Sequence, residues 1–356
     1  MNKKFGLFYC FALLVSLMTT SCNSDDDLVG NWVVAPTDFA GSARGYAASF
    51  VVDNNLYVFG GYDGDYNFND LWRLDLSTED GSWEQLASLA DSTATVSNTS
   101  TAHYKRKYAT AFAIGTAGYV GTGWDGDDYM KDFWKYDTET DSWTQIADFP
   151  GTARYGCYAF TLGSTGYVGG GKGYTSTANS GESYFNEMYS YDPTSDSWTS
   201  VDVKGHKRAF ASVFVIDDVA YIFGGYYSSG VPNDMWSFDG TTWTQKAYIT
   251  NYTDKSFDDD YTTIARYNGA TFVINGKGYV TCGTSSSGSF MKYTWEYNPT
   301  TDRWKEKTSF EKTVRTGAVA ATLSTGAGIV LTGNTGSTYL EDVNYFYPTE
   351  DYDSND

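Results

Sequence analysis

The stretch KDFWKYDTETDSWTQIADFP, residues 131–150, has the pattern of a β-strand, a turn and a second β-strand. The same pattern recurs in the same order in NDLWRLDLSTEDGSWEQL (69–86), NEMYSYDPTSDSWTSV (186–201), NDMWSFDGTTWTQK (233–246) and KYTWEYNPTTDRWKEK (292–307). An internal repeat of this length decides the architecture before any single residue does. Aromatic residues make up 18% of the chain, and it has 37 glycines but 6 prolines, a composition that predicts an all-β fold.

Each unit contains four elements in a fixed order. A short apolar strand ends in small residues, as in LYVFGG (56–61) and GYVGTG (118–123); an acidic residue and an aromatic strand follow, and a turn then leads to a tryptophan. A basic residue opens the next strand, and these residues are Arg44, Arg106, Arg154, Arg208, Arg266 and Arg315. In the first five units the arginine stands 13 residues before the tyrosine of the apolar strand.

This pattern resembles the kelch repeat over nearly all of residues 31–348. The resemblance implies a six-bladed β-propeller in which each blade holds four antiparallel strands.

Six glycine-ended strands but five blade-end tryptophans leave one strand to be found, and NWVVAPTDF (31–39) supplies it. Trp32 stands 12 residues before Arg44, much as Trp143 stands 11 residues before Arg154. We therefore predict that the amino-terminal segment is the outer strand of the last blade, which closes the ring and removes an exposed sheet edge.

The first 21 residues have the layout of a signal peptide, because Lys3 and Lys4 precede an apolar run too short to span a membrane once its flanks are trimmed. TTSC (19–22) resembles the bacterial lipobox, which implies cleavage before Cys22 and lipidation of its sulfur; the alternative is an ordinary secretory signal with a chance cysteine. Residues 22–30 then form an acidic tether, similar to those that direct some lipoproteins to the outer face of the outer membrane. We expect a surface-exposed outer-membrane lipoprotein that ends in an acidic tail at 349–356.

Charge and cysteine content narrow the expected partners. Loss of Lys3 and Lys4 would take the formal net charge from −20 to −22, which disfavours nucleic-acid binding. Membrane attachment would rest on the lipid alone, and we expect a monomer. Cys157 and Cys282 occupy positions that hold small residues in the other repeats, so we predict packed side chains rather than a disulfide or a nucleophile.

We call the four strands of each blade a to d, counted outward from the axis. Because neighbouring strands run in opposite directions, the long and irregular connections all lie on one face of the propeller, which we call the loop face. The six arginines begin the innermost strands on this face. One interpretation is a binding site for carboxylate- or sulfate-bearing ligands, since guanidinium groups match planar anions. The other is structural: each arginine pairs with backbone carbonyls or with one of the recurring acids Asp70, Asp132, Glu187, Asp234 and Asp342.

Aromatic residues just past the glycines differ from blade to blade and include Tyr62, Trp124, Tyr174 and Tyr226. A half-ring of aromatics over blades one to four, together with Asp63, Asp65, Asp125 and Asp127, suits a sugar, because aromatic faces stack on the C–H side of a pyranose. Packing of the loops by these tyrosines is the plain alternative. The DGD pieces also suggest Ca²⁺, although the rest of an EF-hand loop is missing, and we predict no metal site.

The resemblance leaves the activity open. Galactose oxidase relatives need histidines and a Cys–Tyr cross-link for copper, whereas this chain has only His103 and His206, so we expect no cofactor. The kelch family also includes the sialic-acid epimerase, but no specific catalytic pair can be matched here. Our first hypothesis is a binding module for glycans or for a surface protein partner; the alternatives are a sugar mutarotase or epimerase and a purely adhesive protein.

Overall fold

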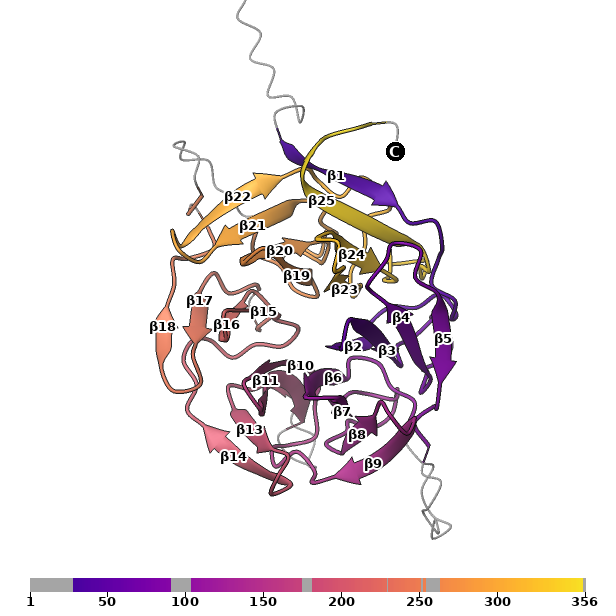
Figure 1. Cartoon of the computed structure of the whole chain (residues 1–356). Helices are drawn as coiled ribbons and strands as arrows, with labels where there is room; N and C mark the ends of the chain where they lie inside the picture. The colour runs from indigo at the N-terminus through magenta and orange to yellow at the C-terminus, as the bar shows by residue number, and fades with distance from the viewer. Residues whose placement is uncertain are drawn as a thin grey trace, which may run out of the picture.

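The computed structural model of the chain describes residues 28–90, 104–174, 181–228, 230–250, 252–253 and 263–354. Cys22 and the leader lie outside these residues. The described part is a ring of six antiparallel sheets around a central axis (Figure 1), so the predicted six-bladed propeller is confirmed. Within the described residues there is no helix, and therefore none that is long and apolar enough to cross a membrane.

The blades follow one another along the chain. Blade 1 holds β2 (Ala48–Val52), β3 (Asn55–Phe59), β4 (Leu71–Asp75) and β5 (Trp83–Leu86). Blade 2 holds β6 (Thr110–Ile114), β7 (Ala117–Gly121), β8 (Phe133–Asp137) and β9 (Ser142–Ile146). Blade 3 holds β10 (Tyr155–Leu162), β11 (Thr165–Tyr174), β13 (Met188–Asp192) and β14 (Ser197–Val201), and its additional strand β12 (Glu182–Tyr184) pairs with β11.

The second half of the ring repeats the order. Blade 4 holds β15 (Ser212–Ile216), β16 (Val219–Phe223), β17 (Met235–Phe238) and β18 (Trp243–Gln245). Blade 5 holds β19 (Ala270–Ile274), β20 (Lys277–Thr281), β21 (Thr294–Asn298) and β22 (Arg303–Lys307). Blade 6 holds β23 (Val319–Thr322), β24 (Gly328–Leu331), β25 (Val343–Asp351) and, as its outer strand, β1 (Val29–Val34).

The amino-terminal strand closes the ring as predicted, because β1 pairs with β25. Trp32 is fully buried, packs edge-on against Phe310 at a centroid distance of 4.7 Å, and donates its indole N–H to the carbonyl of Thr308 at 3.2 Å. Pairing of Val29 with Asp351 extends the sheet past both predicted limits, 31 and 348. The first residues of the predicted acidic tail thus belong to a strand.

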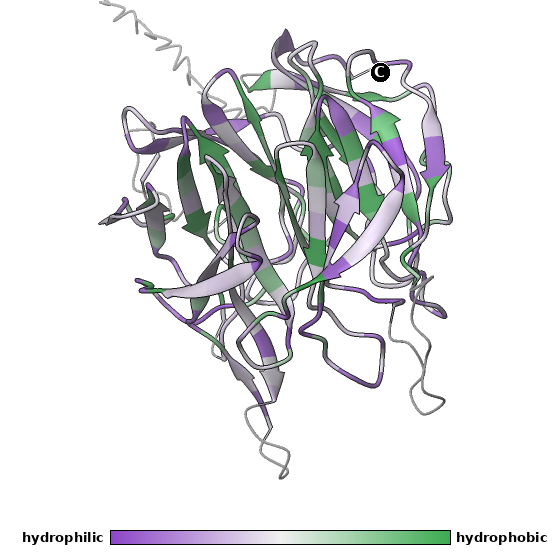
Figure 2. Cartoon of the chain, turned by 60° about the horizontal axis from the view of Figure 1, so that its bottom comes forward, coloured by the Kyte–Doolittle hydropathy of each residue, from purple (hydrophilic) through white to green (hydrophobic). Residues whose placement is uncertain are grey.

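The hydrophobic core lies between neighbouring blades rather than in one central cluster. Figure 2 shows hydrophobic residues gathered on the strands and hydrophilic ones in the connections at their ends. Between blades 1 and 2, for example, Phe50 and Phe59 pack with Val120 and Trp134. A Cβ on Gly118 would lie 2.2 Å from the Phe50 ring, so glycine at this position allows the two sheets to approach.

A closed circle of backbone hydrogen bonds surrounds the axis. Two residues after each arginine, the backbone has a positive φ, between 51° and 64°. Each of these residues donates its N–H to the carbonyl of its counterpart in the preceding blade, at 2.7–3.2 Å, and the circle runs through Tyr46, Tyr108, Gly156, Phe210, Asn268 and Gly317. The bond from Tyr46 to Gly317 joins the first blade to the last and completes the circle.

A second circle reinforces the first. The second small residue at the end of each apolar strand donates its N–H to the carbonyl of the arginine in the next blade, at 2.7–2.9 Å, and these donors are Gly61, Gly123, Gly171, Gly225, Gly283 and Gly333. The residue two positions after each arginine has a positive φ and bonds to the neighbouring blades. The regular inner strand therefore starts four residues past the arginine in five blades and not at the arginine, as the sequence suggested; blade 3, with Tyr155, is the exception.

Aromatic side chains fill the axis beside the first circle. The rings of Tyr46 and Tyr108 lie 4.4 Å apart, and those of Tyr108 and Phe210 lie 5.2 Å apart. Glycine at 156 and 317 makes room for them, since a Cβ there would lie 2.3 Å from Phe210 and 2.2 Å from Tyr46. A small cavity of about 150 Å³ lies along the axis, lined by these residues and by the small side chains that follow them.

Both cysteines are packed and free, as predicted. Cys157 lines the axial cavity, and Cys282 is completely buried at the end of the apolar strand of blade 5. Burial raises the pKa of each thiol to about 11, so neither is a nucleophile at neutral pH.

Candidate binding surface

The six arginines predicted as ligand residues are buried in the body of the propeller. Arg44, Arg106, Arg154, Arg208, Arg266 and Arg315 expose 0–3% of their surface. Each donates one guanidinium N–H to the carbonyl at the end of its own apolar strand, at 2.8–3.1 Å, and the acceptors are Gly60, Thr122, Gly170, Gly224, Cys282 and Thr332. These acceptor residues also have positive φ, so the arginine braces a turn that an extended chain would not make.

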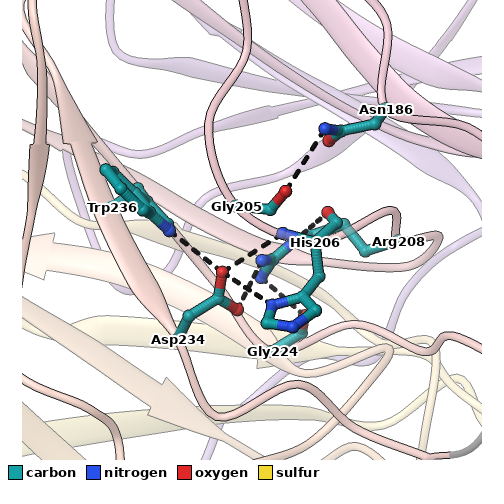
Figure 3. Close-up of polar contacts among 7 residues, drawn as sticks. All are labelled: Asn186, Gly205, His206, Arg208, Gly224, Asp234 and Trp236. Atoms are coloured by element: carbon teal, nitrogen blue, oxygen red, sulfur yellow. Dashed lines mark hydrogen bonds and ion pairs between the residues drawn. The ribbon is translucent and has the colours of Figure 1, made fainter.

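Five of the arginines also pair with the acid at the start of strand c. The guanidinium–carboxylate distances range from 2.5 to 2.9 Å, and the acids are Asp70, Asp132, Glu187, Asp234 and Asp342. Figure 3 shows the arrangement in blade 4, where Asp234 also accepts bonds from the indole of Trp236 at 2.9 Å and from the backbone of His206 at 3.2 Å. Burial alone would raise the pKa of Asp132, Asp234 and Asp342, but the paired arginines outweigh it and lower all three.

Blade 5 departs from this rule, because Tyr293 stands where the other blades have an acid. Arg266 instead donates to the carbonyls of Cys282 at 2.8 Å and Tyr293 at 2.9 Å. Among the described residues no carboxylate pairs with it. Burial lowers the pKa of Arg266 to about 10, which still leaves the guanidinium charged at neutral pH.

These contacts correct the first interpretation of the sequence, in which the six arginines form a binding site for anionic ligands. The guanidinium groups of all six arginines face protein acceptors inside the blades, and none is exposed to a ligand on the loop face. The structural interpretation describes them instead. An arginine that spans the start of strand a, the end of strand b and the start of strand c holds three strands of its blade in one geometry.

Surface residues of the loop face stand directly beside these braced positions. The residue after the second glycine forms a bridge with the residue after the arginine, which places Tyr62, Trp124 and Tyr226 at equivalent sites in blades 1, 2 and 4. Blade 3 has Lys172 at this site, paired with Tyr155, and the predicted Tyr174 lies two residues further along β11. Tyr174 is 51% exposed, whereas the other three are half-buried.

Lys107 connects the aromatic residues of the first two blades. Its ammonium lies 3.6 Å from the centroid of the Tyr62 ring and 4.6 Å from that of Trp124. Burial lowers the pKa of Lys107 below its ordinary value. The lysine thus fills the gap between two aromatic faces, a position that favours a cation.

Glu182 connects the aromatic residues of blades 2 and 3. It accepts hydrogen bonds from the hydroxyls of Tyr129 and of Tyr155, the latter at 3.0 Å, and pairs with Lys172. Burial opposes its ionisation, but these three donors outweigh that effect and lower the pKa of Glu182. Burial and the nearby carboxylate raise the pKa of both tyrosines, so their hydroxyls stay protonated.

The contacts continue around the face. Tyr174 stacks on Tyr129 with a centroid distance of 5.0 Å, and Lys172 reaches the ring of Tyr184 at 5.4 Å. Tyr184 then contacts Tyr226 at 6.1 Å. We call the connected residues the aromatic belt, which consists of Tyr339, Tyr62, Trp124, Tyr129, Tyr155, Tyr174, Tyr184, Tyr226 and Tyr267.

The belt is wider than the predicted half-ring over blades one to four. Tyr267 of blade 5 contacts Tyr226 at 5.1 Å, and Tyr339 of blade 6 contacts Tyr62 at 5.6 Å. Neither tyrosine lies directly after the glycines, where the sequence pattern placed the candidate aromatic residues. Tyr267 directly follows Arg266, so an alignment of the repeats on their arginines is sufficient to identify it.

Two of the four acids proposed as sugar ligands accept hydrogen bonds from the backbone of their own loops. Asp63 accepts the backbone N–H groups of Asp65 and Tyr66 at 2.9 and 2.7 Å, and Asp125 accepts those of Asp127 and Asp128 at the same distances. Asp65 and Asp127 are exposed. In the described parts of the chain, no group of three or more histidine, cysteine or acidic side chains is arranged to hold a metal ion.

Comparison with known proteins also identifies kelch repeats in this chain. A family model, the KLHDC2/KLHL20/DRC7 Kelch-repeats domain, matches residues 30–225 and 153–308. The leucine-zipper-like transcriptional regulator 1 homolog of Drosophila melanogaster is 28% identical over 204 residues, which cover 53% of this chain and 19% of the fly protein. Human kelch domain-containing protein 1 is 26% identical over 292 residues, 74% of this chain and 68% of that protein.

A third relative is an enzyme. The N-acetylneuraminate epimerase of Yersinia enterocolitica is 26% identical over 157 residues, which cover 42% of this chain and 39% of the epimerase. The chain spans about half the length, or less, of the first relatives that it matches, at 19%, 48% and 52%.

Replacement of a bracing arginine should destabilise the propeller far more than replacement of a surface arginine. Arg106→Ala leaves Asp132 without its partner and should lower the free energy of unfolding by about 3–5 kcal/mol. Arg73, whose side chain is 38% exposed and pairs with the exposed Glu84, is the matched control, and Arg73→Ala should cost less than about 1 kcal/mol. Urea unfolding followed by circular dichroism measures both; equal losses would show that the brace is not structural.

Proposed function

Because the chain belongs to the kelch-repeat family, whose propellers generally serve as binding modules, we propose that it is a surface-anchored binding protein whose loop face takes a glycan. The observation that carries the proposal is the exposed ring of Tyr174 stacked on Tyr129, with Glu182 and Lys172 beside it. An aromatic face with a charged pair at its edge matches a sugar ring, which has one apolar C–H face and a rim of hydroxyls.

Two further features support a saccharide ligand. The belt draws residues from all six blades, and the rings of Tyr46, Tyr108 and Phe210 line the axial cavity. Tyr108 contacts Tyr155 of the belt at 5.6 Å. The loop face therefore offers aromatic surface both at its centre and around it. Its charged groups, Lys107, Lys172 and Glu182, are held in fixed positions by ring contacts and hydrogen bonds, so little order has to be imposed when a ligand binds.

The epimerase alternative is favoured by the match to the Yersinia enzyme, but the chemistry of Glu182 speaks against it. Anomer or epimer interconversion needs an acid and a base that exchange protons near neutral pH. The three donors on Glu182 lower its pKa and make it a weak base, while Tyr129 and Tyr155 have raised pKa values and are weak acids. We therefore prefer a binding function over an epimerase activity.

A glycan array and isothermal titration of any hit test the proposal. Tyr174→Ala and Trp124→Ala should each weaken binding about tenfold, because each removes a stacking face. Tyr248→Ala is the control, since Tyr248 is 44% exposed but has no ring contact with the belt. Equal affinity of all three variants would place the site elsewhere.

Two other results would change the proposed ligand or activity. Faster anomer exchange of a bound sugar, seen by NMR, would favour the epimerase. Kelch propellers generally mediate protein–protein interaction, so an absence of glycan hits together with a co-purified surface protein would identify a protein partner instead.

We also propose that the protein is an outer-membrane lipoprotein anchored through Cys22, on the strength of the lipobox-like TTSC and the acidic residues that follow it. Metabolic labelling with a fatty-acid analogue should label the wild type and fail to label Cys22→Ser. Protease treatment of intact cells should then degrade the wild-type protein if it faces outward. Equal labelling of the two forms would contradict the anchor.

A further inference from the structure

An open cavity of about 380 Å³ lies at the boundary between blades 5 and 6, away from the aromatic belt. Its lining includes Lys277 at the start of β20, Lys305 and Lys307 on β22, and Glu296 on β21. Val29, the first residue of β1, and Pro348 of β25 form the wall contributed by blade 6. We call this cavity the rim pocket.

The rim pocket is positively charged in a strongly acidic protein. Three lysines face a single carboxylate, in a chain whose formal net charge is −20. Glu296 is 6% exposed and accepts bonds from Lys277 at 2.5 Å and from the hydroxyl of Tyr279 at 2.8 Å. Glu296 thus has a short ion pair with Lys277 and a longer one, of 3.9 Å, with Lys307. Among the residues that the structure describes, no carboxylate lies within hydrogen-bond distance of the ammonium groups of Lys305 and Lys307.

Of the three lysines, Lys307 gives the strongest indication that an anion binds in the pocket. Its side chain is only 6% exposed, yet its ammonium is 3.9 Å from the closest carboxylate oxygen, that of Glu296, which is too long for a hydrogen bond. Burial lowers the pKa of Lys307, and Lys305 and Lys277 act in the same direction against the opposing effect of Glu296. An ammonium packed beside two other lysines, with one long ion pair, is stabilised when an anion binds next to it.

Blade 5 differs from the other blades at this site. Glu296 lies opposite the tyrosine of strand b, where blades 1 and 2 have Arg73 and Lys135 and blades 3 and 4 have serine. The pocket is therefore not a product of the repeat. It arises from the pattern RWKEK (303–307), which occurs in this blade only.

We propose that the rim pocket binds the phosphate group of a phosphate ester. Lysine ammonium groups bind phosphate oxygens as point charges, and a phosphate ester, with close to two negative charges at pH 7, is attracted by several ammonium groups more strongly than a single carboxylate is. Lys305 and Lys307 supply the attraction, and Glu296 holds Lys277 and Tyr279 at the edge of the site. The size of the cavity leaves room for an organic group beside the phosphate.

Two sources of this ligand are distinguished by experiment. One is a soluble phosphate ester; the other is the headgroup of an anionic phospholipid, because the chain enters the propeller at Val29, on the wall of the pocket. The probes are glycerol phosphate, and vesicles of phosphatidylglycerol compared with vesicles of phosphatidylcholine. Binding is measured by isothermal titration for the first and by vesicle sedimentation for the second.

Lys307→Met keeps the packed stem and removes the charge, and it should weaken binding of the responsive probe about tenfold. Lys305→Gln changes an exposed residue, does not threaten the fold, and should act in the same direction. Lys246→Met, on the outer edge of blade 4, is the matched control and should bind like the wild type. Response to glycerol phosphate identifies a soluble ester, and response to phosphatidylglycerol alone identifies a lipid. Absence of binding by the wild type, or equal binding by all variants, overturns the proposal, and neither result bears on the glycan site.

Discussion

The closed circle of backbone hydrogen bonds around the axis is the constraint on which the rest of the structure depends. Tyr46 donates to Gly317, and every other blade donates to its predecessor in the same way, so no blade can shift without breaking a bond on each side. Each bond requires a left-handed residue at the same position. Left-handed geometry is costly for residues other than glycine, and Tyr46, Tyr108 and Phe210 adopt it nonetheless. The buried arginines hold the neighbouring turns at the ends of the apolar strands, such as the turn at Gly60, in the same blades.

This arrangement explains why the variable residues stand where they do. Tyr62, Trp124 and Tyr226 directly follow the glycine whose N–H bonds to the next blade, and Lys107, Tyr155 and Tyr267 directly follow a bracing arginine. The backbone is the same in each blade at these sites, so a side chain can change without altering the ring. A binding surface can therefore be composed blade by blade on a fixed frame. The rim pocket likewise arises from side chains that are particular to one blade, because in blade 5 Lys277 on β20 and the lysines of β22 surround Glu296 on β21.

The sequence was sufficient for the fold because the repeat specifies it many times over. Trp32 identified the closing strand, and the small residues aligned with Cys157 and Cys282 identified both cysteines as packed. The arginines show the limit of this approach: a residue kept in every blade fits a ring of ligand groups and a ring of braces equally well, and only burial decides between them. Lys107 and Glu182 were missed because their roles depend on contacts between blades, which no spacing within one repeat reveals.

Hydrogen–deuterium exchange of the inter-blade amides, compared between the wild type and Trp32→Ala, tests the central claim most directly. Trp32 packs far from the axis, against Phe346 in the closing blade, and its loss should cost about 3–5 kcal/mol. If the ring is one cooperative unit, exchange should accelerate about a hundredfold or more in the segments around Tyr46, Tyr108, Gly156, Phe210, Asn268 and Gly317 alike. Acceleration confined to the last blade, with full protection in the other five, would contradict the account.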